Sequence, residues 1–201
     1  MIAIIDYGAG NIFSVMNALE YLNIPSVLTA DPAQIRTADA IILPGVGAFP
    51  DAMRMLGATG LTALLKEEAE KKPFLGICLG MQMLFDKGWE FEETAGLGLI
   101  PGEIVKIPDM GLKIPHMGWN QLEIQNPCPM LDGVENGDSV YFVHSYMAQT
   151  APEYVSAFCE YGTEIPALVR RGNICGAQFH PEKSGAVGLR MLKNFYDLSK
   201  K

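Results

Sequence analysis

The chain has 201 residues, of which 49% are hydrophobic and 19% charged, a balance typical of a folded globular protein and not of a disordered one. Its net charge of −8 argues against nucleic-acid binding, which usually requires a basic surface. No apolar run is long enough to span a bilayer and the first residues lack the charged segment of a signal peptide, so we expect a cytoplasmic protein that does not bind membranes.

Strand-like and helix-like segments alternate through the first half of the chain. Short apolar runs typical of buried strands occur at residues 2–6, 25–29, 40–43 and 74–77. Helical patterns lie between them, at residues 11–22, 49–56 and 61–71. This alternation predicts an α/β fold with a mostly parallel central sheet and helices on both faces. Functional residues of such sheets lie at the carboxyl ends of the strands.

The turn after the fourth predicted strand carries a candidate nucleophile, Cys78. It lies at the centre of residues 76–80, Gly-Ile-Cys-Leu-Gly, and the residues after it have the spacing of one helix face: Met81, Leu84 and Phe85. A strand, a sharp turn and a helix form a nucleophile elbow, in which the next N–H, that of Leu79, is free to bind an oxyanion. The two glycines are expected because a Cβ would crowd so tight a turn. The alternative role for Cys78 is a buried core cysteine.

The second half of the chain has a different pattern. Short β-like runs are separated by prolines and glycines, at residues 103–107, 121–124, 139–143, 154–158, 167–171 and 173–179. We expect them to add partly antiparallel strands to the same sheet, and we expect residues 184–198 to form a closing helix. Because no linker, repeat or low-complexity segment is evident, the sequence predicts one domain covering residues 1–201.

A histidine and a glutamate follow the last predicted strand, in the sequence His180-Pro181-Glu182. On an extended chain, residues two apart point to the same side, and Pro181 disfavours a helix. An imidazole stabilises a thiolate and later returns the proton, while a carboxylate on its other nitrogen fixes the tautomer. The sequence therefore predicts a catalytic triad of Cys78, His180 and Glu182.

The chain has two other histidines, His116 and His144. His144, at another predicted strand end, is the rival base, but no carboxylate lies close to it in sequence. His116 is predicted to be a loop residue with a structural or contact role. Neither these histidines nor the four cysteines have zinc-site spacing, so we expect no metal, no other cofactor and free thiols.

Residues 44–49, Pro-Gly-Val-Gly-Ala-Phe, form a glycine-rich turn between a predicted strand and a predicted helix. Its backbone N–H groups, together with that of Leu79, predict a two-donor oxyanion site. Such a turn can also bind phosphate, as can residues 7–11. The third glycine of the dinucleotide fingerprint and the Walker lysine are both absent, so we discount nucleotide binding.

Taken together, residues 76–82 and 178–182 resemble the class I (triad) glutamine amidotransferases. Within that class the resemblance is closest to the glutaminases of imidazole glycerol phosphate synthases, on residues 5–11, 44–49, 115–120, 141–146 and 179–184. Residues 115–120, Pro-His-Met-Gly-Trp-Asn, are the most specific of these segments. The resemblance covers essentially the whole chain. The loop at residues 88–94 carries no diagnostic signal.

The resemblance implies a reaction and a partner. Cys78 would attack the carboxamide carbon of glutamine, with His180 and Glu182 as base and orienting carboxylate. The oxyanion would bind to backbone amides of Leu79 and of Val46 and Gly47. Glutamine would be held by Gly47, Gln82, His144, Ser145 and Tyr146. Ammonia would pass to a (βα)₈-barrel cyclase that makes imidazole glycerol phosphate and aminoimidazole carboxamide ribotide in histidine biosynthesis. The residues implied at the surface for this partner are Asn11, Trp119, Tyr141 and Lys183.

Three alternatives stay open at this point. The chain could be a glutaminase that serves another synthase, such as pyridoxal phosphate synthase. It could be a non-catalytic module that binds the barrel, although the intact triad argues against this. A cysteine peptidase is also possible, although no sequence feature indicates a peptide groove.

Overall fold

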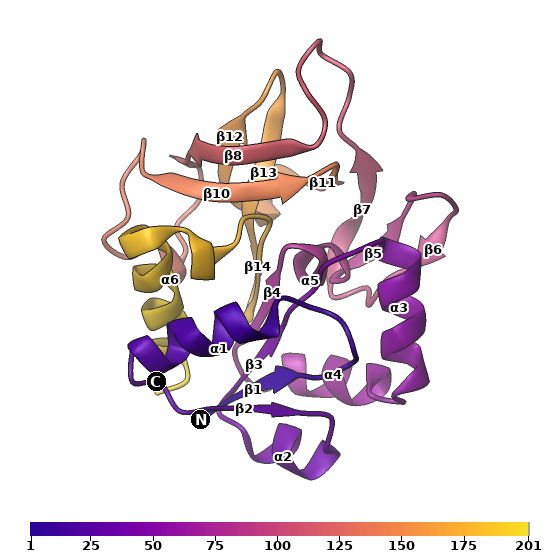
Figure 1. The fold of residues 1–201 in the computed structure, drawn as a ribbon, viewed down its shortest axis with the longest axis vertical. Helices are drawn as coiled ribbons and strands as arrows, with labels where there is room; N and C mark the ends of the chain where they lie inside the picture. The colour runs from indigo at the N-terminus through magenta and orange to yellow at the C-terminus, as the bar shows by residue number, and fades with distance from the viewer. Residues whose placement is uncertain (201) are drawn as a thin grey trace.

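An eight-stranded sheet forms the centre of the molecule in the computed structural model, which describes residues 1–200 (Figure 1). The strand order is β2-β1-β3-β4-β14-β13-β12-β9. Its parallel part consists of β2 (Ser26–Thr29), β1 (Ile2–Ile5), β3 (Ala40–Leu43), β4 (Phe74–Ile77) and β14 (Ile174–Ala177). Its antiparallel part consists of β13 (Glu164–Arg171), β12 (Val155–Glu160) and β9 (Glu123–Ile124). The predicted α/β architecture is confirmed.

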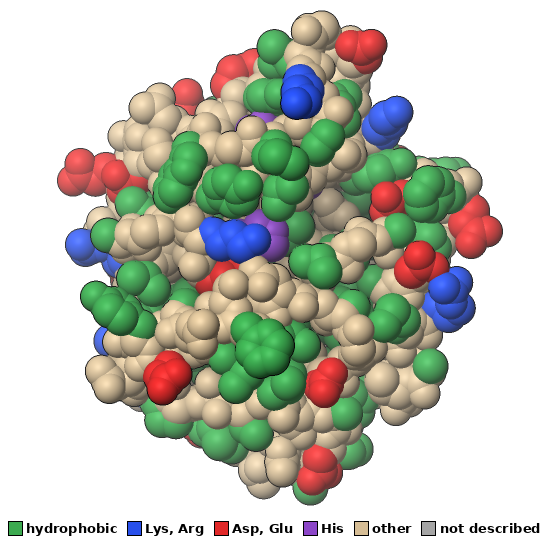
Figure 2. Space-filling view, in the orientation of Figure 1, with side chains coloured by type: hydrophobic (Ala, Val, Ile, Leu, Met, Phe, Trp, Pro, Cys, Tyr) green, Lys and Arg blue, Asp and Glu red, His purple; other side chains and the backbone are tan. Residues whose placement is uncertain are grey.

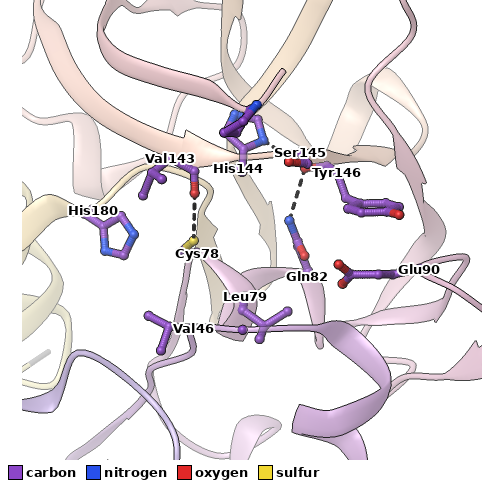
Figure 3. A pocket seen from close by; sticks show the side chains of 12 residues that line it. Val46, Cys78, Leu79, Gln82, Glu90, Val143, His144, Ser145, Tyr146 and His180 are labelled. Carbon is purple, nitrogen blue, oxygen red and sulfur yellow. Dashed lines mark hydrogen bonds between the residues drawn. The ribbon is translucent and has the colours of Figure 1, made fainter. Parts of the chain in front are cut away.

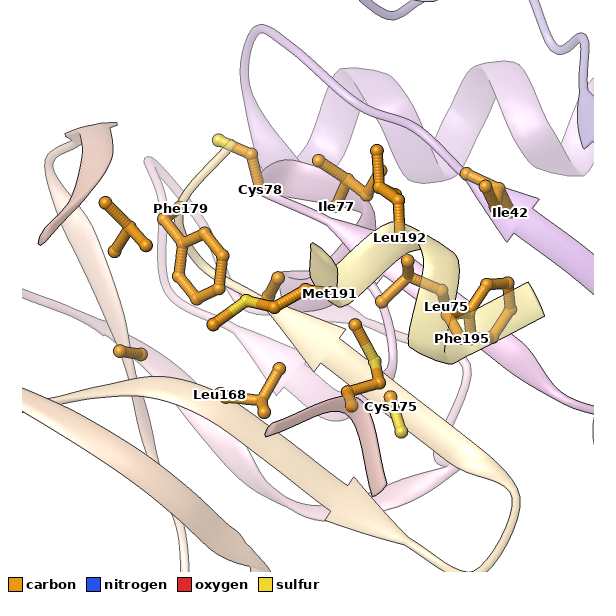
Figure 4. Close-up of a cluster of buried hydrophobic side chains, with 14 of the residues drawn as sticks. Ile42, Leu75, Ile77, Cys78, Leu168, Cys175, Phe179, Met191, Leu192 and Phe195 are labelled. Atoms are coloured by element: carbon orange, nitrogen blue, oxygen red, sulfur yellow. The ribbon is translucent and has the colours of Figure 1, made fainter. Parts of the chain in front are cut away.

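Helices cover both faces of the parallel part. One face carries α1 (Ile12–Tyr21) and α6 (Gly185–Leu198), and the other carries α2 (Pro32–Thr37), α3 (Phe49–Ala58) and α4 (Thr62–Ala69). Successive side chains of a strand point to opposite faces. Ile42 therefore packs in the core beneath α1 and α6, whereas Ile41 packs in the core beneath α3 and α4. Figure 4 shows the first of these cores, in which Met191, Leu192 and Phe195 of α6 lie over the sheet. No helix within residues 1–200 has both the length and the hydrophobicity to cross a bilayer.

Two of the strands predicted for the main sheet belong to smaller sheets. β10 (Ser139–His144) pairs antiparallel with β8 (His116–Gln121). β7 (Ile100–Lys106) lies in a four-stranded sheet with β11 (Tyr146–Gln149), β5 (Phe85–Gly88) and β6 (Thr94–Ala95). The prediction that all second-half strands extend one sheet is therefore wrong for β7 and β10. Alternation along a strand indicates its buried face, but it does not identify the strand with which it pairs.

The helix predicted after Cys78 is a single turn, α5 (Leu79–Gln82), and Phe85 already begins β5. The chain leaves the helix because the carbonyls of Met83 and Leu84 accept the N–H groups of Leu97 and Leu99, each at 2.8 Å. These acceptors would otherwise continue the helical ladder. The apolar spacing correctly marked the buried side chains, but the competing partners lie more than ten residues away. The remaining elements are three 3₁₀ turns, η1 (Pro129–Leu131), η2 (Pro152–Tyr154) and η3 (Pro181–Lys183).

Candidate active site

Cys78 lies on a strained turn at the carboxyl end of β4. Its backbone has φ +54° and ψ −112°, a conformation that non-glycine residues rarely adopt. Two backbone hydrogen bonds hold it there. The Cys78 N–H donates to the carbonyl of Ala177 on β14 at 2.7 Å, and the Cys78 carbonyl accepts the N–H of Gln82 at 3.1 Å. The side chain is 7% exposed, at the base of a cavity. The structure thus has the elbow that the sequence predicts.

The glycines on either side of Cys78 are required by close backbone packing. A Cβ on Gly76 would lie 2.5 Å from the Gly80 carbonyl oxygen. A Cβ on Gly80 would lie 1.9 Å from the carbonyl oxygen of Leu43, at the end of β3. Neither neighbour is a flexible side chain that could move aside. The expectation that a Cβ would crowd this turn is confirmed.

His180 and Glu182 form a buried pair beside Cys78. The carboxylate Oε1 of Glu182 accepts a hydrogen bond from Nδ1 of His180 at 2.7 Å, and their side chains are 1% and 3% exposed respectively. The backbone N–H of His180 donates to the carbonyl of Tyr141 at 2.9 Å, which fixes the position of the base. The predicted pairing is correct, but the extended geometry given for it is wrong. Pro181 is the first residue of the 3₁₀ turn η3. Proline is compatible with this position because the first turn of a helix does not need its N–H.

The surroundings of His180 favour its protonated form. Burial lowers the pKa of His180, but hydrogen bonds and charge interactions with Cys78 and Glu182 outweigh burial and raise it to about 9. Nδ1 is occupied by the carboxylate, so Nε2 is the nitrogen available to the sulfur. Figure 3 shows His180 and Cys78 on the same side of the cavity. The pair is therefore arranged for proton exchange between imidazole and thiol.

A cavity of about 400 Å³ opens over the Cys78 sulfur (Figure 3). Most of the predicted site residues line it together with Cys78 and His180: Val46, Gly47, Leu79, Gln82, His144, Ser145 and Tyr146. Glu182 stands behind His180 and does not line the cavity. The structure therefore gathers predicted residues from four separate segments of the chain into one site.

Two backbone groups are candidates for an oxyanion hole. The Leu79 N–H begins α5 and has no hydrogen-bond acceptor within residues 1–200. Gly47 has φ +102°, and no heavy atom lies within 4 Å of a Cβ built there, so the turn after β3 is open to a ligand. Val46, beside it, is 45% exposed.

Glu90 is a cavity residue that was not predicted, because its loop carries no diagnostic sequence signal. One carboxylate oxygen accepts the N–H of Phe49 at 2.7 Å, at the first residue of α3, and the side chain also lines the cavity (Figure 3). Negative charge at a helix N-terminus is favourable. A single glutamate in a polar loop carries no local pattern, so only the folding of β5 and β6 reveals its position. Pro115 and Val143 also line the cavity and were not predicted.

Both nitrogens of His144 are occupied by hydrogen bonds. Nδ1 lies 2.8 Å from the carbonyl oxygen of Tyr146, and Nε2 lies 2.9 Å from Nδ1 of His116. His116 is not a loop residue as predicted, because it begins β8 opposite His144 and is only 2% exposed. Burial lowers the pKa of each of these two histidines to about 4.

Three of the four predicted partner-interface residues are neighbours. The rings of Trp119 and Tyr141 meet edge to face at 6.1 Å, and Nζ of Lys183 lies 6.0 Å from the Tyr141 ring centroid. Trp119 is 59% exposed, which excludes a core role. Asn11 precedes α1 and accepts a hydrogen bond from the Ser14 hydroxyl at 3.0 Å. Figure 2 shows hydrophobic side chains gathered over β8 and β10, the strands that carry Trp119 and Tyr141.

The fold and the cysteine elbow define a class-I glutamine amidotransferase, and the chain belongs to that family, whose model matches residues 3–198. Within it, the chain belongs with the HisH subunits of imidazole glycerol phosphate synthase. It is 52% identical to "Imidazole glycerol phosphate synthase subunit HisH" of Caldanaerobacter subterraneus subsp. tengcongensis, over 100% of this chain and 99% of the relative. It is 50% identical to the HisH subunit of Listeria innocua serovar 6a, over 99% of this chain and 96% of the relative.

Solved structures of lower identity share the fold. The crystal structure of a glutamine amidotransferase superposes with a TM-score of 0.77 at 18% identity and covers 100% of both chains. The structure of PurLQS from Thermotoga maritima gives a TM-score of 0.73 at 21% identity and covers 98% of this chain and 97% of that chain. Within residues 1–200, no three His, Cys, Asp or Glu side chains are grouped as metal ligands would be.

Proposed function

We propose that this chain hydrolyses glutamine to glutamate and ammonia through a thioester on Cys78. One observation carries the proposal. A cysteine held at positive φ shares a small cavity with a free backbone N–H and with His180, which is hydrogen-bonded to the buried Glu182 behind it. These groups are the nucleophile, base, orienting carboxylate and oxyanion donor that acyl transfer from an amide requires.

The proposed reaction has two halves. The Cys78 sulfur attacks the carboxamide carbon while the backbone N–H groups of Leu79 and of the Val46–Gly47 turn bind the oxyanion. His180 gives its proton to the departing nitrogen, and ammonia leaves. Water then attacks the thioester and gives a proton to His180. Glutamate is released and the free thiol of Cys78 is regenerated. Glu182 stays bonded to Nδ1 of His180 throughout and holds the ring in place.

The rest of the cavity suits a free amino acid. Gln82, Gly47 and the backbone of His144, Ser145 and Tyr146 are proposed to hold glutamine. The Glu90 carboxylate, at the opposite side of the cavity from His180 in Figure 3, is proposed to pair with the α-ammonium group. A cavity of about 400 Å³ is at the small end of ligand sites and favours a small molecule over a peptide, which argues against a peptidase.

The proposed destination of the ammonia is a cyclase with a (βα)₈-barrel fold. The names of the relatives support it, because they are subunits of imidazole glycerol phosphate synthase. We propose a cytoplasmic heterodimer in which residues 1–201 act as one glutaminase domain in histidine biosynthesis. The products formed by the cyclase would be imidazole glycerol phosphate and aminoimidazole carboxamide ribotide. The four buried thiols are free, as a reducing compartment favours. The residues proposed to contact the cyclase are Asn11, Trp119, Tyr141 and Lys183.

The decisive measurement is the release of ammonia and glutamate from glutamine, with and without the cyclase and its nucleotide ligand. We expect weak turnover by the chain alone and strong stimulation by the complete complex. If the cyclase gives no stimulation but another synthase does, the partner assignment is wrong and the glutaminase assignment stands.

Variants separate the roles of the side chains. Cys78→Ala is expected to abolish hydrolysis while keeping the fold and the complex, and residual glutaminase activity would show that the nucleophile is misassigned. His180→Asn should remove hydrolysis far more completely than His144→Asn if His180 is the base. Trp119→Ala should weaken binding of the cyclase and leave unfolding unchanged, because its side chain is largely exposed.

A further inference from the structure

A chain of hydrogen-bonded polar side chains, the half-buried Asn120 and the buried His116 and His144, runs from β8 to the wall of the cavity. The ring of His116 lies between those of Phe142 and Tyr161, with ring centroids 4.7 Å and 4.0 Å away. Its Nδ1 contacts Nε2 of His144 at 2.9 Å, and its Nε2 contacts the amide nitrogen Nδ2 of Asn120 at 3.3 Å. At the other end, Nδ1 of His144 contacts the carbonyl oxygen of Tyr146 at 2.8 Å. We call Asn120, His116 and His144 the histidine relay.

The backbone fixes the orientation of the first member of the histidine relay. The backbone N–H of Gln121 donates to Oδ1 of Asn120 at 2.8 Å, and Nδ2 of Asn120 donates to the carbonyl of Glu160 at 2.9 Å. If the amide were flipped, Oδ1 would face the carbonyl oxygen of Glu160, and Nδ2 would face the N–H of Gln121. Neither arrangement forms a hydrogen bond. The second Nδ2 hydrogen of Asn120 therefore points to Nε2 of His116, and that nitrogen must be an acceptor.

The direction of every other bond follows from this one. Because Nε2 of His116 accepts, its proton is on Nδ1, which donates to Nε2 of His144. His144 then carries its own proton on Nδ1 and donates to the carbonyl of Tyr146, which can only accept. Both rings are neutral in this arrangement, in agreement with the lowered pKa values that burial gives them.

The relay ends on an atom that also orients a cavity side chain. The Tyr146 carbonyl accepts a second hydrogen bond, from Nε2 of Gln82 at 3.1 Å, and Nε2 of Gln82 also donates to Oε1 of Gln178 at 3.1 Å. Gln82 lines the cavity that is proposed to bind glutamine. The relay also occupies Nε2 of His144, so that nitrogen cannot accept a proton from Cys78, whose Sγ lies 3.8 Å from the neighbouring Val143 carbonyl oxygen.

We propose that His116 and Asn120 are positioning residues for the glutamine site. They hold His144 neutral, with its proton on Nδ1, and thereby fix the Tyr146 carbonyl and Gln82 against the substrate and leave His180 as the base. This inference rests on the proposed glutaminase function, and the experiments below separate the failure of one from the failure of the other.

The first test is the position of the ring protons. Long-range ¹H–¹⁵N NMR of the histidine-labelled chain distinguishes a proton on Nδ1 from one on Nε2. We expect the Nδ1–H form for both His116 and His144. In Asn120→Asp an acceptor replaces the donor, so we expect the proton of His116 to move to Nε2. The matched control is Asn126→Asp, which loses two similar bonds from Nδ2 to the carbonyls of Pro152 and Val155, outside the relay.

The second test is the binding of glutamine. In a Cys78→Ala background, calorimetry measures affinity without turnover. We expect His116→Phe, which keeps a ring between Phe142 and Tyr161 but breaks both hydrogen bonds, to weaken glutamine binding about 10-fold, the effect of about one hydrogen bond. His116→Asn, which keeps a donor near the Nδ1 position, should recover part of the loss. In the active enzyme with its cyclase, His116→Phe should raise KM more than it lowers kcat.

Each outcome has a separate meaning. An Nε2–H proton on either ring in the unmodified chain overturns the relay, even if the variants fail to fold. Unchanged glutamine affinity in both His116→Phe and Asn120→Asp also overturns it, as does an equal loss in Asn126→Asp. If Cys78→Ala with an intact relay binds no glutamine and the unmodified chain does not hydrolyse it, the glutaminase proposal fails instead, whatever the tautomers.

Discussion

Replacing Cys78 by alanine is expected to lower the pKa of His180. Burial alone would lower this pKa, but interactions with Cys78 and Glu182 raise it from 6.5 to about 9. At about 1.4 kcal/mol per pKa unit, the rise corresponds to about 3 kcal/mol in favour of the imidazolium form. A hydrogen bond that involves a charged group contributes about 1.5–3 kcal/mol, so removal of the sulfur should lower the pKa by about 1 to 2.

The assay is an NMR titration of the ¹⁵N-labelled histidines, of which the chain has three. The signals should separate well, because His116 and His144 have pKa values lowered to about 4. Cys159→Ala, a change at a buried cysteine on β12, is the control and should leave the His180 titration unchanged. The reasoning is refuted if His180 titrates at the same pH in Cys78→Ala and in the unmodified chain.

Three further predictions concern stability and affinity. Folding lowers the pKa values of His116 and His144 from 6.5 to about 4. The free energy of unfolding should therefore be highest above pH 6.5 and fall as the pH drops through 4, by up to about 3 kcal/mol per ring, because the unfolded state takes up protons first. Urea unfolding at several pH values in this interval measures the loss. Gly80→Ala should destabilise the protein by more than about 3 kcal/mol in thermal unfolding, since its Cβ would meet a backbone carbonyl at 1.9 Å. Glu90→Gln keeps an acceptor for the Phe49 N–H but removes the charge, so KM for glutamine should rise about 10- to 100-fold in the active complex.

Specific results would contradict these predictions. An unfolding free energy that stays constant from pH 6.5 to about 4 would show that the buried histidine rings do not oppose protonation. Gly57→Ala is the control for Gly80→Ala, because no heavy atom lies within 4 Å of a Cβ there, and equal effects of the two changes would contradict the packing argument. An unchanged KM in Glu90→Gln would remove the proposed contact with the α-ammonium group.

Local patterns predicted those parts of the site that are built from consecutive residues. The elbow at Cys78 could be predicted because strand, turn and glycines lie within a few positions. His180 and Glu182 were paired correctly because they are two residues apart, although a 3₁₀ turn and not an extended strand brings them together. Glu90 and the strand position of His116 could not be predicted, because each depends on pairing between segments, β5 with β6 and β8 with β10.

Close packing between the elbow at Cys78 and the glycine-rich turn after β3 explains how two separate segments of sequence can form the proposed oxyanion site. A Cβ on Gly45 would lie 2.6 Å from the backbone nitrogen of Gly80, and a Cβ on Gly80 would lie 1.9 Å from the carbonyl oxygen of Leu43. The turn after β3 and the first turn of α5 are therefore in direct backbone contact. Glycine at 80 therefore permits both the tight turn around Cys78 and the close approach of this turn to the end of β3. The Gly-x-Cys-x-Gly pattern thus shapes the turn that carries the proposed nucleophile and also allows the turn with the proposed second oxyanion donor to pack against it.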